Sequence, residues 1–357
     1  MKKGKKTLGL LLAASMFLSA CGGNAASQPA ATQEAPKETT TQTQAEAEAP
    51  ADDTVYKLRV GIQQASTHSY TLAFQEFEKN IEGKTNGRIQ VELYPDSVLG
   101  SEGDMQEMVS AGDLEMCPTT FLVQYDPLYA MLEMPYVFDD FDHVKNFFNS
   151  DACQTLYERL IGSKKIRILT YFGNGFRQIT NNKKPINHPG DVAGLSLRTP
   201  ENQAQIETFK LLGAVVTPLA FTELYNALQQ NVVDGQENPI QQIATAKFYE
   251  VQKYMAMTNH MFNPGAIIVN EDWYQGLPDD LKEILNECIS EASEWQLTYV
   301  ENSDAENLQM IIDNGVEVTY PDMDEFKQAT APVIDIMYEQ LGDEARELVK
   351  AIDSCRK

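Results

Sequence analysis

An arginine placed where a strand gives way to a helix is the residue of this chain best suited to bind an anion. Residues 194–198 alternate between apolar and polar types, as in a short strand that ends at Arg198. Thr199 is predicted to cap the next helix, with Pro200 in its first turn and residues 203–212 as its body. Ligands of open α/β sheets bind beyond the carboxyl ends of the strands. Because a guanidinium can hold a carboxylate through two parallel hydrogen bonds, Arg198 is a candidate carboxylate ligand. The alternative is a structural ion pair.

Signatures of common enzyme sites are missing from the chain. It contains no GxxxxGK[ST] phosphate loop, no HExxH zinc motif and no GxSxG nucleophile elbow. Its four histidines, His68, His143, His188 and His260, do not show the spacing of metal ligands. We therefore predict no catalytic residue, no cofactor and no metal.

The segments that would position Arg198 alternate between strands and helices. Strands are expected at 58–62, 87–94, 114–120, 166–172, 194–198 and 214–218, and helices at 69–82, 105–111, 203–212 and 221–228. This alternation predicts a mainly parallel sheet with helices on both faces. Gly173 and Gly175 suggest a bend after the fourth strand. Residues 278–314 carry apolar residues at three- and four-residue steps, which predicts one long helix, or two in near-continuity, that would run about 50 Å along two lobes.

The first 54 residues are predicted to stand apart from the fold. Residues 1–20 combine four lysines with a short apolar stretch, as in a signal peptide. Residues 18–22 resemble a bacterial lipobox, so Cys21 is expected to carry lipid after cleavage; an ordinary signal peptide with a chance cysteine is the alternative. Residues 21–54 then form a flexible linker, because few of them are large and apolar.

The charge of the chain limits its partners. The formal net charge is -24, so nucleic acid and anionic lipid surfaces are not expected to bind to the general surface. An anionic ligand would need a local basic pocket. Cys117, Cys153, Cys288 and Cys355 show no metal spacing, and disulfides between them are possible but not implied.

Several motifs occur together in an order that resembles a known family. They are GFRQITN at 175–181, GLSLRTP at 194–200, ALQQNVVDGQENP at 227–239 and FYEVQKY at 248–254. These motifs, with MPYVF at 134–138, resemble the DctP-type substrate-binding proteins of TRAP transporters, which are ATP-independent uptake systems for organic acids.

The resemblance implies an α/β, two-lobed fold like that of periplasmic binding proteins, with a hinge cleft and a long helix that bridges both lobes. Lobe I is expected at 55–175, with about 265–303 returning to it. Lobe II is expected at 176–264, with about 304–357 packing on it.

The resemblance also implies a set of solute ligands. They are Arg198, Arg177, Asn238 and Phe221 from lobe II, and Glu102, Thr119, Thr120, Gln63 and His68 from lobe I. By residue type alone, each has a structural alternative. Arg177 could hold the hinge together, Asn238 could cap a turn, and Phe221 could belong to the core.

The family implies an extracytoplasmic lipoprotein that captures a carboxylate-bearing organic acid and hands it to a small and a large membrane subunit. A monomer is expected. The sialic-acid-binding branch has an acidic residue in place of Thr120 and an asparagine in place of Gln63. Smaller acids, such as C4-dicarboxylates, 2-oxo acids or uronates, are therefore better candidates than sialic acid. Of these, a uronate or other sugar acid, or a C4-dicarboxylate, is the solute we expect, with a 2-oxo acid or a sialic-acid-like solute as the alternative. An enzyme or an adhesin on the same scaffold is less favoured.

Overall fold

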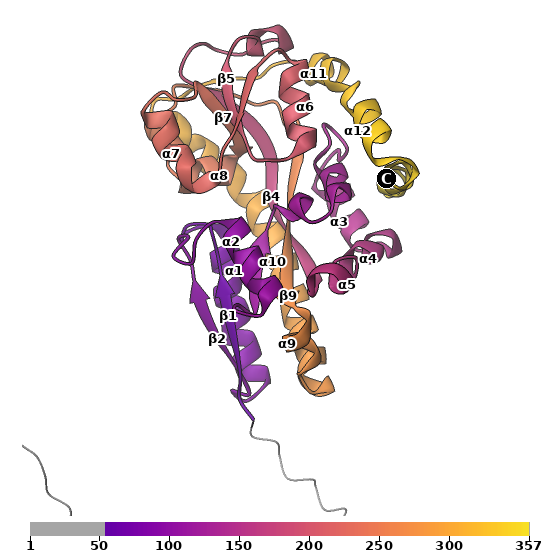
Figure 1. Cartoon of the computed structure of the whole chain (residues 1–357). Coiled ribbons are helices and arrows are strands. Elements are labelled where there is room, and N and C mark those ends of the chain that lie inside the picture. Colours follow the sequence, from indigo (N-terminus) through magenta and orange to yellow (C-terminus); the bar gives the residue numbers. More distant parts are fainter. Residues whose placement is uncertain (1–53, 357) are drawn as a thin grey trace, which may run out of the picture. The chain divides into compact units, whose positions relative to one another are not determined.

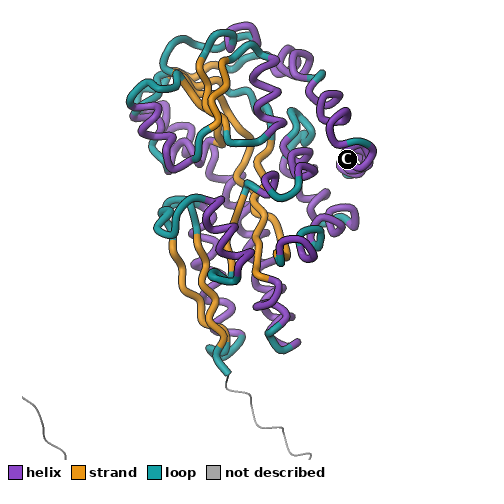
Figure 2. The backbone as a smooth tube through the Cα atoms, viewed as in Figure 1, coloured by secondary structure: helices purple, strands orange, loops and turns teal. Residues whose placement is uncertain are grey.

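The computed structural model describes residues 54–356 as an α/β fold around a ten-stranded sheet (Figures 1 and 2). The predicted signal peptide, Cys21 and nearly all of the predicted linker lie outside the described residues. The strands, in chain order, are β1 (Tyr56–Gly61), β2 (Ile89–Tyr94), β3 (Met116–Thr119), β4 (Ile166–Asn181), β5 (Ser196–Thr199), β6 (Val215–Pro218), β7 (Gly235–Pro239), β8 (Tyr254–Ala256), β9 (Phe262–Asn270) and β10 (Glu317–Thr319).

The sheet has two parallel halves joined by two long antiparallel strands. Its main path runs β2-β1-β3-β9-β4-β7-β5-β6, and β8 connects β10 to β4. Strand β1 pairs in parallel with β2 and β3, and β5 pairs in parallel with β6 and β7. At the centre, β9 is antiparallel to both β3 and β4, and β4 is antiparallel to β7. The prediction of a mainly parallel sheet is therefore right within each half and wrong at the centre, where β4 and β9 run between the halves in opposite directions.

Helices flank both halves of the sheet. In Figure 1, α1 and α2 lie with β1 and β2 and α9 lies at the end of β9, whereas α6, α7 and α8 lie with β5 and β7. The α-helices are α1 (Ser69–Lys84), α2 (Glu102–Ala111), α3 (Phe141–Phe148), α4 (Asp151–Tyr157), α5 (Ile161–Lys164), α6 (Gln203–Leu211), α7 (Phe221–Gln229), α8 (Ile240–Thr245), α9 (Glu271–Gln275), α10 (Asp279–Asp313), α11 (Met323–Thr330), α12 (Val333–Leu341) and α13 (Asp343–Ser354). Short 3-10 helices are η1 (Leu122–Gln124), η2 (Pro127–Glu133), η3 (Pro189–Val192) and η4 (Phe248–Glu250). Among the described helices, none combines the length and the apolar character needed to cross a bilayer.

Strand β4 passes from one half of the sheet to the other without interruption. The predicted bend is a bulge within this strand, because its register against β9 shifts between Gly173 and Gly175. Gly175 has a φ of 109°, a conformation that other residues rarely adopt. At Gly173 a Cβ atom would collide with the side chain of Leu297 in α10. The two glycines thus allow the strand to bulge and the helix to approach it.

Helix α10 contacts both halves of the fold, as predicted. Leu281, Leu285 and Ile289 belong to the hydrophobic cluster formed with β1 and α1. Ile311, near the other end of the helix, belongs to a separate cluster formed with α7 and α8. Between them, the Gln296 amide binds both the N–H (2.8 Å) and the carbonyl oxygen (2.7 Å) of Gly173.

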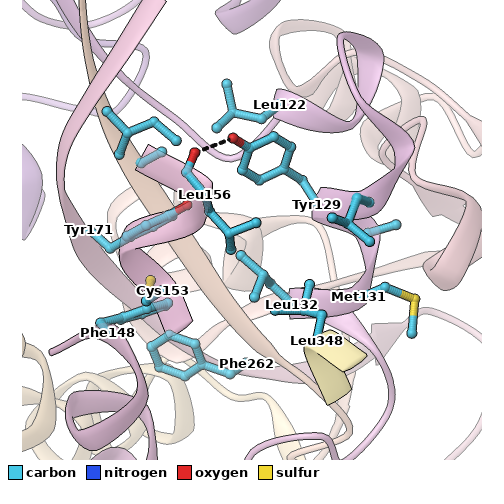
Figure 3. Packing of buried hydrophobic residues seen from close by; sticks show 14 of the residues in the cluster. Leu122, Tyr129, Met131, Leu132, Phe148, Cys153, Leu156, Tyr171, Phe262 and Leu348 are labelled. Carbon is cyan, nitrogen blue, oxygen red and sulfur yellow. Dashed lines mark hydrogen bonds between the residues drawn. The ribbon is translucent and has the colours of Figure 1, made fainter. Parts of the chain in front are cut away.

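A further hydrophobic cluster joins η2, α3, α4 and the C-terminal helices (Figure 3). The Tyr129 hydroxyl donates to the carbonyl oxygen of Leu156 at 2.7 Å, and Leu348 of α13 belongs to the same cluster. His143 of α3 also contacts the carbonyl oxygen of Ile352 in α13 at 2.8 Å. Helix α13, at the end of the segment that is expected to pack on lobe II, thus also contacts elements of the first half of the fold.

The start of α6 differs from the sequence prediction. The helix begins at Gln203, and the Asn202 side chain caps it by accepting a hydrogen bond from the N–H of Ala204 at 2.9 Å. Thr199 is the last residue of β5, and its hydroxyl is buried without a hydrogen-bond partner in the described part of the chain. The predicted cap was thus three residues early.

Candidate functional site

A cavity of about 250 Å³ lies beyond the carboxyl ends of β1, β3, β5, β6 and β7, where the two halves of the sheet face each other. Ligands of α/β sheets bind at such edges. Seven of the nine predicted ligands line the cavity, namely Gln63, Glu102, Thr120, Arg177, Arg198, Phe221 and Asn238. The structure therefore brings together residues that are distant in sequence and that come from both halves of the sheet.

Arg198, at the end of β5, is a buried cation that faces the cavity. Only 3% of its surface is exposed. Its Nε and Nη2 atoms donate to the carbonyl oxygen of Leu219 at 2.9 and 2.7 Å, and it forms no ion pair with a carboxylate among residues 54–356. Burial lowers the pKa of Arg198 to about 10, although the charge of Glu237 opposes this effect. A carboxylate ligand would supply the missing counter-charge.

Arg177, on β4, is already neutralised by Glu237 of β7. The Arg177 Nη2 atom lies 2.9 Å from a Glu237 carboxylate oxygen, and Nε contacts the other oxygen. Nη2 also donates to the side-chain oxygen of Asn238 at 3.2 Å. Burial alone would raise the pKa of Glu237, but the charge of Arg177 and the hydrogen bond from His260 hold it below its usual value. Arg177 thus fixes Asn238 at the cavity wall but brings little net charge.

Glu102 begins α2 and faces the cavity from the first half of the sheet. One carboxylate oxygen accepts from the N–H (3.1 Å) and the hydroxyl (2.9 Å) of Thr120. The other accepts from the Gln64 amide at 3.3 Å. The N–H of Glu102 donates to the side-chain oxygen of Gln63 at 3.1 Å. Burial raises the pKa of Glu102, and the hydrogen bonds from Thr120 only partly offset this.

Two predicted ligands lie behind the cavity wall. The Thr119 hydroxyl accepts from the Gln106 amide and from the N–H of Phe121, and Thr119 is not among the cavity-lining residues. His68 caps α1, and its Nε2 atom lies 3.1 Å from the side-chain oxygen of Asn174, which does line the cavity. Burial lowers the pKa of His68 to about 3. Both residues are thus placed to support the wall.

Sequence reasoning missed four amide side chains that line the cavity: Gln64, Asn174, Gln242 and Asn263. Asn174 and Asn263 come from the crossing strands β4 and β9, which are buried on both faces, so alternation gives no signal there. Gln64 follows a residue of the same type, and Gln242 lies just beyond the motif that ends at Pro239. The only sequence signal available was that Asn174 and Gln242 lie close to one of the family motifs.

The amides continue into a buried network that centres on Glu133 of η2. Asn174 donates to Asn263 at 3.0 Å, and Asn263 donates to Glu133 at 2.7 Å. Asn202 and Gln205 also donate to Glu133, each at 2.9 Å. Burial raises the pKa of Glu133 to about 8, despite the charge of Arg177 and the hydrogen bond from Asn263. The network joins the cavity wall to the beginning of α6.

Apolar side chains form the remaining wall. Leu219, Ala220 and Phe221 line the cavity at the start of α7, and Phe121 lines it after β3. Phe221 also packs against Phe248 of η4, with ring centroids 5.8 Å apart. The cavity is therefore lined by apolar side chains on one part of its surface and by polar side chains on the rest. Of its two lining arginines, only Arg198 lacks a carboxylate partner in the described chain.

Known proteins resemble this chain over most of its length. A family model described as bacterial extracellular solute-binding protein, family 7, matches residues 60–341. The sialic acid-binding periplasmic protein SiaP of Vibrio cholerae is 36% identical over 255 residues, which cover 71% of this chain and 79% of that protein. The C4-dicarboxylate-binding protein DctB of Bacillus subtilis is 32% identical over 289 residues, which cover 80% of this chain and 82% of that protein.

Solved structures share the fold. The crystal structure of the sugar acid binding protein of Advenella mimigardefordensis in complex with galactonate matches with a TM-score of 0.81 and 26% identity. The match covers 85% of this chain and 99% of that structure. The two-lobed architecture is therefore shared over nearly the whole described part of the chain.

Proposed function

This chain belongs to the bacterial extracellular solute-binding protein family 7, and we propose that it holds the carboxylate of its solute with Arg198 in the 250 Å³ cavity. Members of this family are solute-binding proteins of TRAP transporters and not enzymes. The protein thus captures a carboxylate-bearing organic acid outside the cytoplasm and works with the membrane subunits of a transporter.

One observation carries the assignment of the ligand. Arg198 is buried, faces the cavity and has no carboxylate partner within residues 54–356. A buried cation without a counter-ion is costly, and an incoming carboxylate would both remove this cost and gain bidentate hydrogen bonds. Either a sugar acid or a C4-dicarboxylate meets this requirement; a 2-oxo acid or a sialic-acid-like solute is the alternative.

The other predicted ligands take secondary roles in this proposal. Asn238, oriented by Arg177, binds a polar group of the solute next to the carboxylate. Glu102, Thr120 and Gln63 bind its hydroxyl groups, and Phe221 packs against its carbon chain. Thr119 and His68 act indirectly, through Gln106 and Asn174.

Binding is coupled to closure of two lobes. We place lobe I at 55–175, with about 265–303 returning to it, and lobe II at 176–264, with about 304–357 packing on it; α13 also contacts elements of lobe I. Because the cavity is lined from both halves of the sheet, the solute binds the closed form with more contacts than the open form. Only this difference in affinity shifts the equilibrium toward closure.

Membrane attachment is a separate part of the proposal. Cleavage before Cys21 and lipidation of its thiol would tether a monomer to the outer face of the cytoplasmic membrane through the linker at 21–54. The support is the order of lysines, apolar stretch and lipobox in residues 1–22. The variant Cys21→Ser should release the protein from the membrane fraction.

A ligand screen tests the proposed function. Purified protein that starts after Cys21 would be mixed with dicarboxylates, 2-oxo acids, uronates and aldonates, and unfolding would be followed by differential scanning fluorimetry. A ligand that binds only the folded state raises the unfolding temperature. Calorimetric titration would then give the affinity. If no carboxylic acid raised the unfolding temperature while neutral sugars or amines did, the proposal would be wrong.

A further inference from the structure

Two buried glutamines of the cavity wall have side-chain oxygens without a partner. Gln64 is 2% exposed and Gln242 is 3% exposed, and both line the cavity. No hydrogen bond of good geometry reaches the Oε1 atom of either residue in the described chain, although the Gln242 side chain also interacts with His68. Buried polar atoms in folded proteins are nearly always paired, and an unpaired one is costly. Gln64 follows β1 in one half of the sheet, and Gln242 lies in α8 beside the other half.

The orientation of the Gln64 amide is fixed by its neighbours. Its Nε2 atom donates to a Glu102 carboxylate oxygen at 3.3 Å, so a reversed amide would place two oxygens against each other. Its loop is also held, because the N–H of Asp96 donates to the carbonyl oxygen of Gln64 at 3.0 Å and the N–H of Ser97 to that of Ile62 at 3.2 Å. The Gln64 amide is therefore held in one orientation within the cavity wall.

The charges around the cavity do not suit a second carboxylate. The positive charge of Arg177 is balanced by Glu237, which leaves Arg198 as the lining cation without a carboxylate partner in residues 54–356. Next to Gln64 stands the carboxyl group of Glu102. A second anionic group of the solute would meet acceptors and like charge on this side, whereas a hydroxyl group would donate to them.

We infer that Gln64 and Gln242 determine specificity by accepting hydrogen bonds from hydroxyl groups of the solute. The solute is then a polyhydroxylated acid with one carboxylate, and dicarboxylates without hydroxyls are rejected because they leave both amide oxygens unpaired. A site built to bind a hydroxyl discriminates strongly against the analogue that lacks it. This inference rests on the proposed function, because it takes the carboxylate to be held by Arg198.

The experiment compares solutes that differ only in hydroxyl groups. Calorimetry would measure the dissociation constants of six-carbon aldonates, of their mono-deoxy analogues and of adipate for the wild type, Gln64→Leu, Gln64→Asn and Gln242→Leu. The wild type should bind the best aldonate about 10- to 100-fold more tightly than one of its deoxy analogues and than adipate. Gln64→Leu should abolish the preference for one hydroxyl, and Gln242→Leu the preference for another. Gln64→Asn keeps the amide but withdraws its oxygen, so it should reduce the same preference even if Gln64→Leu folds poorly.

Gln252→Leu is the matched control. It removes a buried glutamine that does not line the cavity and whose oxygen already accepts from the Thr180 hydroxyl at 2.9 Å, so it should leave the ratio between aldonate and deoxy analogue unchanged. The inference would be overturned if the wild type bound adipate or succinate as tightly as any aldonate. It would also be overturned if Gln64→Asn and Gln242→Leu kept the wild-type ratios. A wild type that binds no acid at all would instead contradict the proposed function.

Discussion

The Arg198 guanidinium is attached to the carbonyl oxygen of Leu219 by two hydrogen bonds, from Nε at 2.9 Å and from Nη2 at 2.7 Å. This contact joins β5 to the loop after β6 and holds the arginine in place before any solute arrives. The side chain therefore loses little conformational freedom on binding, and its charge is available to an anion that enters the cavity.

Replacing Arg198 should weaken binding of the solute but leave the stability of the ligand-free fold nearly unchanged. Arg198→Met should weaken binding of the acid by about 2–5 kcal/mol, because the carboxylate of the solute is left buried and unpaired. The unfolding temperature without ligand should change little, since removal of a buried charge offsets the two lost hydrogen bonds. Arg198→Lys should also bind weakly, because an ammonium lacks the planar fork. Calorimetry and thermal unfolding would measure both quantities, and wild-type affinity in Arg198→Met would contradict the assignment.

Breaking the Arg177–Glu237 pair should destabilise the fold itself. Glu237→Gln leaves the buried Arg177 cation without its counter-ion, which should cost about 3–5 kcal/mol of the free energy of unfolding. The double variant Arg177→Met/Glu237→Gln should lose less than the sum of the losses of Arg177→Met and Glu237→Gln, because it leaves no unpaired charge. Urea unfolding of the four proteins would give the coupling, and additive losses would show that the pair does not act as a unit.

The free energy of unfolding should fall as the pH rises, because burial makes the folded protein hold the proton of Glu133 more tightly than the unfolded chain does. Burial raises its pKa in the folded protein to about 8, above the ordinary value of 4.5, so the folded state retains this proton longer than the unfolded state. Its contribution is fully present below about pH 4.5 and is lost as the pH rises to about 8. The free energy of unfolding of Glu133→Gln, relative to that of the wild type, should therefore rise between pH 5 and 8, by at most about 1.4 kcal/mol per pH unit.

The Glu133→Gln variant should be tolerated, because the Gln205 side-chain oxygen is buried without a partner in the described chain and can turn to accept from the new amide. Urea unfolding at several pH values would measure the difference. Glu294→Gln, on the exposed side of α10, is the control and should follow the wild type. A difference between Glu133→Gln and the wild type that does not change with pH would exclude Glu133 as the source.

The two residues that compete to cap α6 should respond differently to mutation. Asn202→Ala removes the cap and a hydrogen bond to Glu133, so it should cost about 1–2 kcal/mol or more. Thr199→Val removes a buried hydroxyl that has no partner within residues 54–356 and should be neutral or slightly stabilising. Chemical denaturation would rank them, and a larger loss for Thr199→Val would show that the helix begins earlier in solution.

Much of the fold was accessible from local patterns. The alternation around Leu197 predicted β5, and the three- and four-residue periodicity of 278–314 predicted one long helix or two in near-continuity, which the structure resolves as the single helix α10. The position of Arg198 at a strand end, together with the family motifs, placed it at the cavity. These features are encoded by residues that are close in sequence.

The remainder depends on contacts between distant residues. Thr199 and Asn202 are both favourable capping types, with Asn the better of the two; Asn202 caps the helix in the structure, where its amide also reaches Glu133, 69 residues away. Asn263 sits in β9, which is buried throughout, so no alternation marks the side that faces the cavity. The neutralisation of Arg177 could not be foreseen either, because Glu237 lies on another strand within a motif that was interpreted for its asparagine.

Helix α10 has a mechanical consequence for the cycle of capture and release. One part of it is embedded in the cluster with β1 and α1, its far end in the cluster with α7 and α8, and Gln296 fastens it to β4 in between. A helix held at three places cannot keep all of these contacts unchanged when one lobe rotates against the other. Closure around a solute must therefore bend α10 or shift one of these contacts, so the helix couples the positions of the two lobes.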